Sequence, residues 1–209
     1  ERRLLVDRIK QLAIPGTYSY LQIKTVNYKG TFGSLWPASN RNWVIHKPAD
    51  FHVRADGTLM VDTEGLTSEG EFHCNAYPSA VRMICSTGMW PMFAYTETIN
   101  SSVLYMTDWN IPPGSMFNPQ NPWAGTVMGL GEASGYIFAF MNCLSMSYFA
   151  RGFLEETFLQ DGGCIGYGLS GVLGDGFGWA GGDMSLITCI GQGAYPYRDG
   201  LSAAACTPN

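Results

Sequence analysis

The sequence predicts an α+β fold: a β-rich part with a leading helix in residues 1–63, then a helix-rich and glycine-rich part of the same domain in residues 64–209. Before residue 63, apolar residues alternate with a period of two, the spacing of half-buried strands. After it, long apolar runs with few charges are typical of buried helices. The chain has 209 residues, 46% hydrophobic and 13% aromatic, so it can bury a substantial core.

The first elements follow from local patterns. Residues 1–14 place apolar side chains at helical spacing between charges and stop at a Pro-Gly pair, which predicts a short amphipathic helix. Alternation of period two begins at Thr17 and predicts a strand. Residues 42–53 and 59–61 flank an Asp-Gly pair between β-forming runs, so they predict a hairpin.

A segment with very few charges follows. Residues 83–150 contain no Lys or Arg, which predicts that they lie in the interior. Residues 133–150 are uncharged and long enough to approach a membrane span. The polar Ser134 and Asn142 within that run favour a helix buried inside a protein instead. We therefore expect no membrane contact.

Three elements are predicted within this segment. Residues 77–95 predict a helix that is broken near Gly88 and Pro91. Residues 102–110 predict a strand that ends at a proline turn. Residues 123–149 predict a long helix.

Glycines form two patterns. Two pairs spaced by four lie near the start of the long helix, where they let another backbone approach closely: Gly125 and Gly129, and Gly131 and Gly135. Residues 162–182 hold ten glycines with no period and no Lys, which predicts a connector. Residues 166–171 match GxGxxG by letter, but the strand before and the helix after that a nucleotide loop needs are not evident.

Charge and cysteine content limit the partners and the compartment. Residues 1–56 carry a net charge of +5 and residues 57–209 carry −10, so no phosphate-binding face is predicted and nucleic acid is not an expected partner. The six cysteines show no CxxC spacing and are interpreted as buried, reduced thiols in the cytoplasm. The chain opens with Glu1 and its first methionine is Met60, so we expect an internal piece of a longer polypeptide.

The loop after the third predicted strand is the candidate catalytic region. Asp62, Glu64, His73 and Asn75 gather there beside apolar sequence, where the pKa values of titratable groups can be tuned. His73 is suited to proton transfer near neutral pH, and Asn75 either binds an oxyanion or caps a helix. Solvated loop carboxylates are the alternative for Asp62 and Glu64. The histidines lack the spacing of metal ligands, so we expect no metal ligand in this chain.

Several strings resemble the hydantoinase B/oxoprolinase family. The resembling segments follow one order along the chain: residues 59–67, Asn75, Asn100, residues 111–124, residues 191–194 and residues 198–200. The proline-rich string IPPGSMFNPQNPWA at residues 111–124 is the specific part, whereas VD-x-x-G at Val61 would be weak alone. The resemblance covers approximately residues 1–200.

Within the family, the Met-rich and aromatic sequence is most similar to the large subunits of acetone carboxylases. This resemblance implies an ATP-dependent ligase that carboxylates acetone with bicarbonate, needs a divalent metal, manganese above all, and assembles with a hydantoinase A-like subunit and a small third subunit. It implies that the nucleotide binds the hydantoinase A-like partner and that the metal motif precedes this stretch. The fragment alone is expected to be inactive.

Two alternatives remain open. The tract at residues 69–74 and the string at residues 100–102 depart from the family pattern, so a hydantoinase or 5-oxoprolinase subunit that hydrolyses a cyclic amide is the second reading. A non-catalytic, β-rich binding module with Trp36, Trp43 and Trp109 as stacking platforms is the third. The nearly charge-free middle of the chain disfavours such a module.

Overall fold

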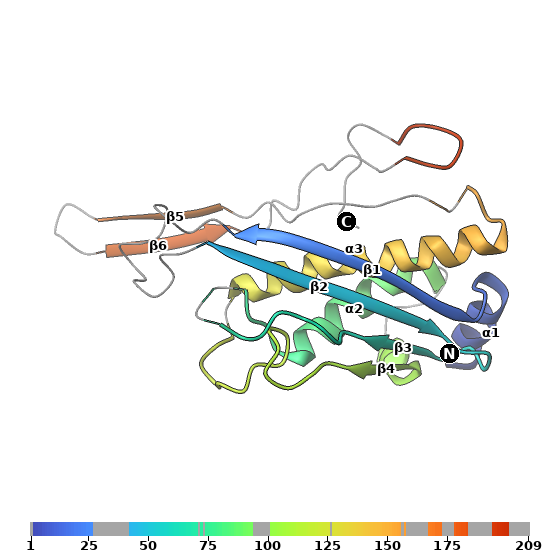
Figure 1. Ribbon diagram of the computed structural model, residues 1–209, viewed down its shortest axis with the longest axis horizontal. Helices are drawn as coiled ribbons and strands as arrows, with labels where there is room; N and C mark the ends of the chain where they lie inside the picture. Colours follow the sequence, from blue (N-terminus) through green and yellow to red (C-terminus); the bar gives the residue numbers. More distant parts are fainter. Residues whose placement is uncertain are drawn as a thin grey trace.

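A mixed four-stranded sheet with two long helices on one face forms the framework of the protein (Figure 1). The computed structural model describes the following residues: 2–26, 42–70, 72, 74–93, 101–125, 127–155, 157, 167–172, 178–183 and 194–200. The sheet and helices together confirm the predicted α+β class.

The sheet has the strand order β1-β2-β3-β4. The strands are β1 (Gly16–Val26), β2 (Trp43–Val53), β3 (Leu59–Asp62) and β4 (Thr107–Asn110). The first three pair antiparallel, and β4 pairs parallel with β3. In the predicted hairpin between β2 and β3, Gly57 adopts a φ of 79°, and the Asp56 carboxylate accepts a hydrogen bond from the Thr58 backbone N–H at 2.9 Å.

The two faces of the sheet differ because side chains alternate along each strand. In β2, Ile45, Ala49 and Phe51 face inward and are buried, whereas His46 and His52 face outward. The two histidines thus share one face, as their spacing predicts. The inward face packs on α3, where the ring of Phe51 meets that of Phe140 edge to face at 5.3 Å.

Three α-helices complete the core. The amphipathic α1 (Arg2–Leu12) buries Leu5 and Ile9 as its spacing predicts. Helix α2 (Pro78–Phe93) packs on α3 (Val127–Arg151), and α3 also contacts β1 and β2. The α3 helix is buried on most of its surface, which confirms the interior helix predicted there. Among the helices in the described ranges, none combines the length and the apolarity needed to cross a bilayer.

Four predicted features differ from the structure. Helix α2 is unbroken at Gly88 and Pro91, and it ends at Phe93, two residues after Pro91. The 3-10 helix η2 (Ser101–Met106) occupies the first half of the strand predicted at residues 102–110. Helix α3 begins at Val127 rather than at residue 123, since the preceding residues form a hydrogen-bonded turn.

The fourth difference is in the glycine-rich tract, where the prediction of a connector is wrong. Strands β5 (Tyr167–Val172) and β6 (Gly178–Asp183) pair antiparallel as a separate two-stranded sheet. Residues 167–171 of the GxGxxG string therefore lie in a strand, not in a loop that opens a helix. Cross-strand pairing forms this sheet. A period-two pattern is absent from the sequence here because glycine has no side chain.

Trp43 and Trp109 are partly buried against the core, and the three described cysteines are buried. Trp109 stacks on Phe140 at 5.7 Å, and Trp43 lies 5.0 Å from Phe72, so neither is an exposed stacking platform. Trp36 lies outside the described residues. Cys74, Cys85 and Cys143 are buried and unpaired, as predicted for reduced thiols: they form no disulfide in the described part of the chain.

Candidate functional site

Two loops meet at the ends of β3 and β4. Because these neighbouring strands are parallel, the loop after β3 (residues 63–76) and the loop after β4 (residues 111–125) leave the same edge of the sheet. Three backbone hydrogen bonds join them: Met116 N–H to Thr67 O at 2.9 Å, Glu69 N–H to Gly114 O at 2.8 Å and Ala76 N–H to Met116 O at 2.8 Å. The joined loops project beyond the strand ends at the left of the sheet (Figure 1).

Asp62 is held at the start of this loop pair. Its Oδ1 accepts a hydrogen bond from Asn110 Nδ2 at 2.9 Å and another from the Glu64 backbone N–H at 2.9 Å. Its Oδ2 accepts no hydrogen bond from any described residue. Glu64 is exposed beside it, so the structure brings together two of the four predicted site residues. An oriented carboxylate with a free oxygen can accept a proton.

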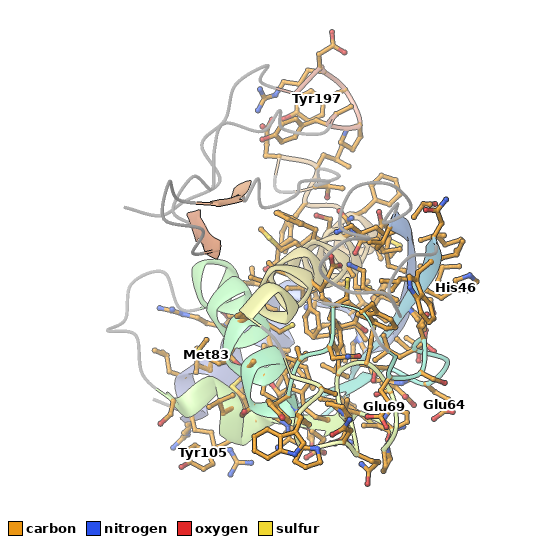
Figure 2. The ribbon with its side chains drawn as sticks, turned by 90° about the vertical axis from the view of Figure 1, so that its left-hand side faces the viewer. His46, Glu64, Glu69, Met83, Tyr105 and Tyr197 are labelled. Carbon is orange, nitrogen blue, oxygen red and sulfur yellow. The ribbon has the colours of Figure 1, made fainter. Side chains whose placement is uncertain are left out.

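Glu69 fastens the second loop to the first. Its Oε2 accepts hydrogen bonds from the backbone N–H groups of Gln120, at 2.6 Å, and Asn121, at 3.2 Å. Figure 2 shows Glu64 and Glu69 on the same side of the molecule, apart from Met83 on α2 and Tyr105 on η2. Sequence reasoning missed Glu69, because nothing in its own loop indicates a partner about fifty residues later.

Asn75 is buried, and its amide is already engaged within the first loop. Its Nδ2 donates to Gly70 O at 2.7 Å and to Phe72 O at 3.2 Å. The amide therefore orders the loop and does not cap α2, which begins at Pro78. His73 lies outside the described residues, so its role stays a prediction.

A buried charge cluster lies between the sheet and α3. Glu132 accepts hydrogen bonds from Lys47 Nζ at 2.9 Å and from Lys24 Nζ, and Lys47 is only 1% exposed. Burial raises the pKa of Glu132, but the charges and hydrogen bonds of the two lysines outweigh it, so the pKa lies below its usual value. Burial and then the Glu132 charge raise the pKa of the nearby Cys74 thiol to about 12.

This charge cluster was also missed from the sequence. The available signals were an inward register position for Lys47 and a lone carboxylate at Glu132 in a long apolar helix. An inward lysine on one strand and a single acid on a buried helix are expected to pair, because an unpaired buried charge is costly.

A cleft opens between α2, η2 and β4. Its volume is about 460 Å³, and its lining includes Arg82 of α2, Leu104 of η2 and Asp108 of β4. Arg54 forms an ion pair with Asp108. The volume is within the range of small-molecule sites. None of the predicted site residues lines it.

The described residues do not form a metal centre. No group of three or more His, Cys, Asp or Glu side chains within the described ranges is arranged to hold an ion. Asp62 and Glu64 have no third such ligand among the residues that the structure describes, and Glu132 is neutralised by two lysines. These residues therefore do not fit a divalent cation.

Comparison with known proteins identifies the class. Residues 3–209 match the family model for hydantoinase B/oxoprolinase, so the chain belongs to this family. It is 29% identical, over 227 residues, to the acetone carboxylase alpha subunit of Xanthobacter autotrophicus (strain ATCC BAA-1158 / Py2). The aligned region covers 98% of this chain and 26% of that subunit, so the chain spans about a quarter of its relative's length. The resemblance inferred from the motifs is confirmed.

The similar solved structures include an acetone carboxylase and a caprolactamase. The nucleotide-free structure of acetone carboxylase, from work on the mechanism of ATP-dependent acetone carboxylation, gives a TM-score of 0.82 at 28% identity, covering 98% of this chain and 27% of that one. The ATP-dependent caprolactamase from Pseudomonas jessenii gives a TM-score of 0.56 at 14% identity, covering 98% and 33%. At 14% identity, the second similarity concerns the fold alone.

Proposed function

We propose that this chain is part of the large subunit of a cytoplasmic, ATP-dependent ligase that carboxylates acetone with bicarbonate to acetoacetate. The observation that carries the proposal is the similarity to acetone carboxylase over 98% of the chain, with a TM-score of 0.82. A hydantoinase A-like subunit and a small third subunit complete the proposed assembly.

The chemistry explains the need for ATP. Acetone is a weak carbon acid and bicarbonate is a poor electrophile, so both must be activated before a carbon–carbon bond forms. Phosphoryl transfer from ATP would give a carboxyphosphate-like electrophile and a phosphoenol nucleophile. We assign manganese to other parts of the assembly, since the described residues do not fit a divalent cation. We assign ATP to the hydantoinase A-like subunit, as the family resemblance implies.

Within this chain, we propose that the loop pair contributes proton transfer and positioning. Asp62 would accept a proton through its free Oδ2, because Asn110 and the Glu64 N–H fix its other oxygen. Glu64 would supply a second carboxylate beside it, and His73 would exchange a proton with the substrate. Asn75 would act as a positioning residue through its two bonds to loop carbonyls.

The decisive experiment measures AMP formation that depends on both acetone and bicarbonate, with co-purified full-length subunits. Asp62→Asn and His73→Ala are expected to lower turnover by about 10²-fold or more, with metal content unchanged. Asp50→Asn is the matched control, because Asp50 lies directly opposite Asp62 on the same face. Wild-type turnover in Asp62→Asn would contradict the role of Asp62. Loss of metal in either variant would contradict the assignment of the metal site to another part of the assembly.

The alternative substrate class is a cyclic amide. The family includes oxoprolinases by its description, and the same loop pair could position an amide for hydrolysis. Activity of the assembled wild-type enzyme on hydantoin or 5-oxoproline, with none on acetone, would replace the carboxylase proposal by this one.

A further inference from the structure

The cleft between α2, η2 and β4 lies outside the loop pair. None of the described residues that line it belongs to either loop, and Figure 2 shows Met83 of the cleft apart from Glu64 and Glu69. Met83, Leu104 and Trp109 form its apolar walls. A water molecule occupies about 30 Å³ in the liquid, so a cleft of about 460 Å³ has room for an organic molecule.

Arg82 gives the cleft a cation without a counter-charge. Its guanidinium forms no hydrogen bond or ion pair with any residue that the structure describes. The carboxylate in the lining, Asp108, is paired with Arg54 instead. Two cations and one carboxylate therefore leave a net positive charge at the cleft, which favours an anionic ligand.

Trp109 and Ser79 add donors to this cation. The Trp109 indole Nε1 is buried and donates to no acceptor among the described residues. A buried N–H without an acceptor is unfavourable, so an oxygen atom of a bound molecule would stabilise it. Ser79 lies one helical turn before Arg82 on α2, in the first turn, where the helix dipole also favours negative charge.

We propose that this cleft binds an organic carboxylate. The carboxylate pairs with the Arg82 guanidinium, which can donate two parallel N–H bonds to it, and the apolar body of the ligand packs against the apolar walls. A bare inorganic anion would leave those walls hydrated, and a neutral apolar molecule would leave the guanidinium without a partner. The proposal does not rest on the proposed function, because it uses only the lining of the cleft.

The test measures the dissociation constant of hexanoate for the full-length polypeptide by isothermal titration calorimetry. Hexanoate joins one carboxylate to a short apolar chain, and hexanamide is its neutral analogue of the same shape. We expect saturable binding of hexanoate. We expect binding about tenfold weaker or more for hexanamide, and for hexanoate with Arg82→Gln, because each change removes one charge of the ion pair.

Two further variants make the test specific. Trp109→Phe keeps an aromatic wall but removes the indole N–H, so it should raise the dissociation constant of hexanoate by about three- to tenfold. Arg3→Gln is the matched control and should leave it unchanged, because Arg3 is exposed on α1 and does not line the cleft. Thermal unfolding checks that each variant is folded.

Four outcomes would overturn the proposal: no saturable binding of hexanoate, equal affinity for hexanamide, unchanged affinity in Arg82→Gln, or an equal loss in Arg3→Gln. The last would mean that hexanoate binds through the overall charge of the protein. The measurement needs no turnover, so its result is independent of whether the assembly carboxylates acetone.

Discussion

Lys47 and Glu132 depend on one another. A lysine that is 1% exposed can stay charged only beside a counter-charge, and Glu132 supplies it at 2.9 Å. Lys24 shares the same carboxylate, but its side chain is 48% exposed. Without Glu132, Lys47 would therefore be a buried charge without its counter-charge, whereas the Lys24 ammonium would still be hydrated.

Replacing the carboxylate tests this dependence. Glu132→Gln should lower the free energy of unfolding by about 3–5 kcal/mol, because Lys47 is left charged and buried. Lys24→Met should cost at most about 1 kcal/mol, because the exposed ammonium is screened by solvent. Urea unfolding of the full-length subunit measures both, and similar losses would contradict the distinction.

The same carboxylate predicts a pH dependence. The pKa of Glu132 is lower in the folded protein than in the unfolded chain, where it is about 4.3. Its contribution to stability is therefore present above that value and is lost as the pH falls through the lower, folded pKa. Unfolding measured across acidic pH should show this loss in the wild type and a shallower one in Glu132→Gln.

At the scale of elements, the approach of α3 to the first loop depends on Gly129. A Cβ at position 129 would overlap the carbonyl oxygen of Asn75. Gly129→Ala should therefore lower the free energy of unfolding by about 1–3 kcal/mol. Gly135→Ala, whose Cβ would lie 3.7 Å from Lys47 Nζ, should be neutral or stabilising by up to about 1 kcal/mol. Thermal unfolding distinguishes them, and tolerance of alanine at 129 would disprove the close approach.

Periodicity was a good guide for elements whose pattern is local. Helix α1, strands β1 to β3 and the Asp-Gly hairpin follow from alternation and turn chemistry. The pairing of β5 with β6 could not be predicted. Strand prediction relies on alternating polar and apolar side chains, and glycine has no side chain. Likewise, α2 continues for two residues past Pro91 before it ends. The presence of a proline alone does not show how many helical residues follow it.

At the scale of the whole molecule, the fold buries the three cysteines of the described residues. Burial raises the pKa of Cys74 and Cys143 to about 12, and raises that of Cys85 still further. At pH 8 about 10⁻⁴ of the first two are thiolates, so their alkylation should follow global unfolding. Iodoacetamide labelling of the native protein, read by peptide mass spectrometry over a urea series, measures it. Rapid labelling of these three residues without urea would contradict the burial.

Only part of the candidate site could be predicted from the sequence. Asp62 and Glu64 are neighbours along the chain, so a carboxylate pair is visible in the letters alone. Asn110 and Glu69 join the site through parallel strand pairing and a contact between two loops, which residue spacing does not reveal. The sequence resemblance identified both loops, and the structure supplies their contact.

The parallel pairing of β3 with β4 also orders events during synthesis. Asp62 and Asn110 are 48 residues apart, and α2 lies between them. At a ribosomal rate of about 5–20 residues per second, β3 waits roughly 2–10 seconds for β4 to emerge. During that interval the hairpin of β2 and β3 has an open edge, and the charge of Asp62 there discourages pairing with a neighbouring nascent chain. We therefore expect the carboxylate proposed for proton transfer to disfavour aggregation of the nascent chain as well.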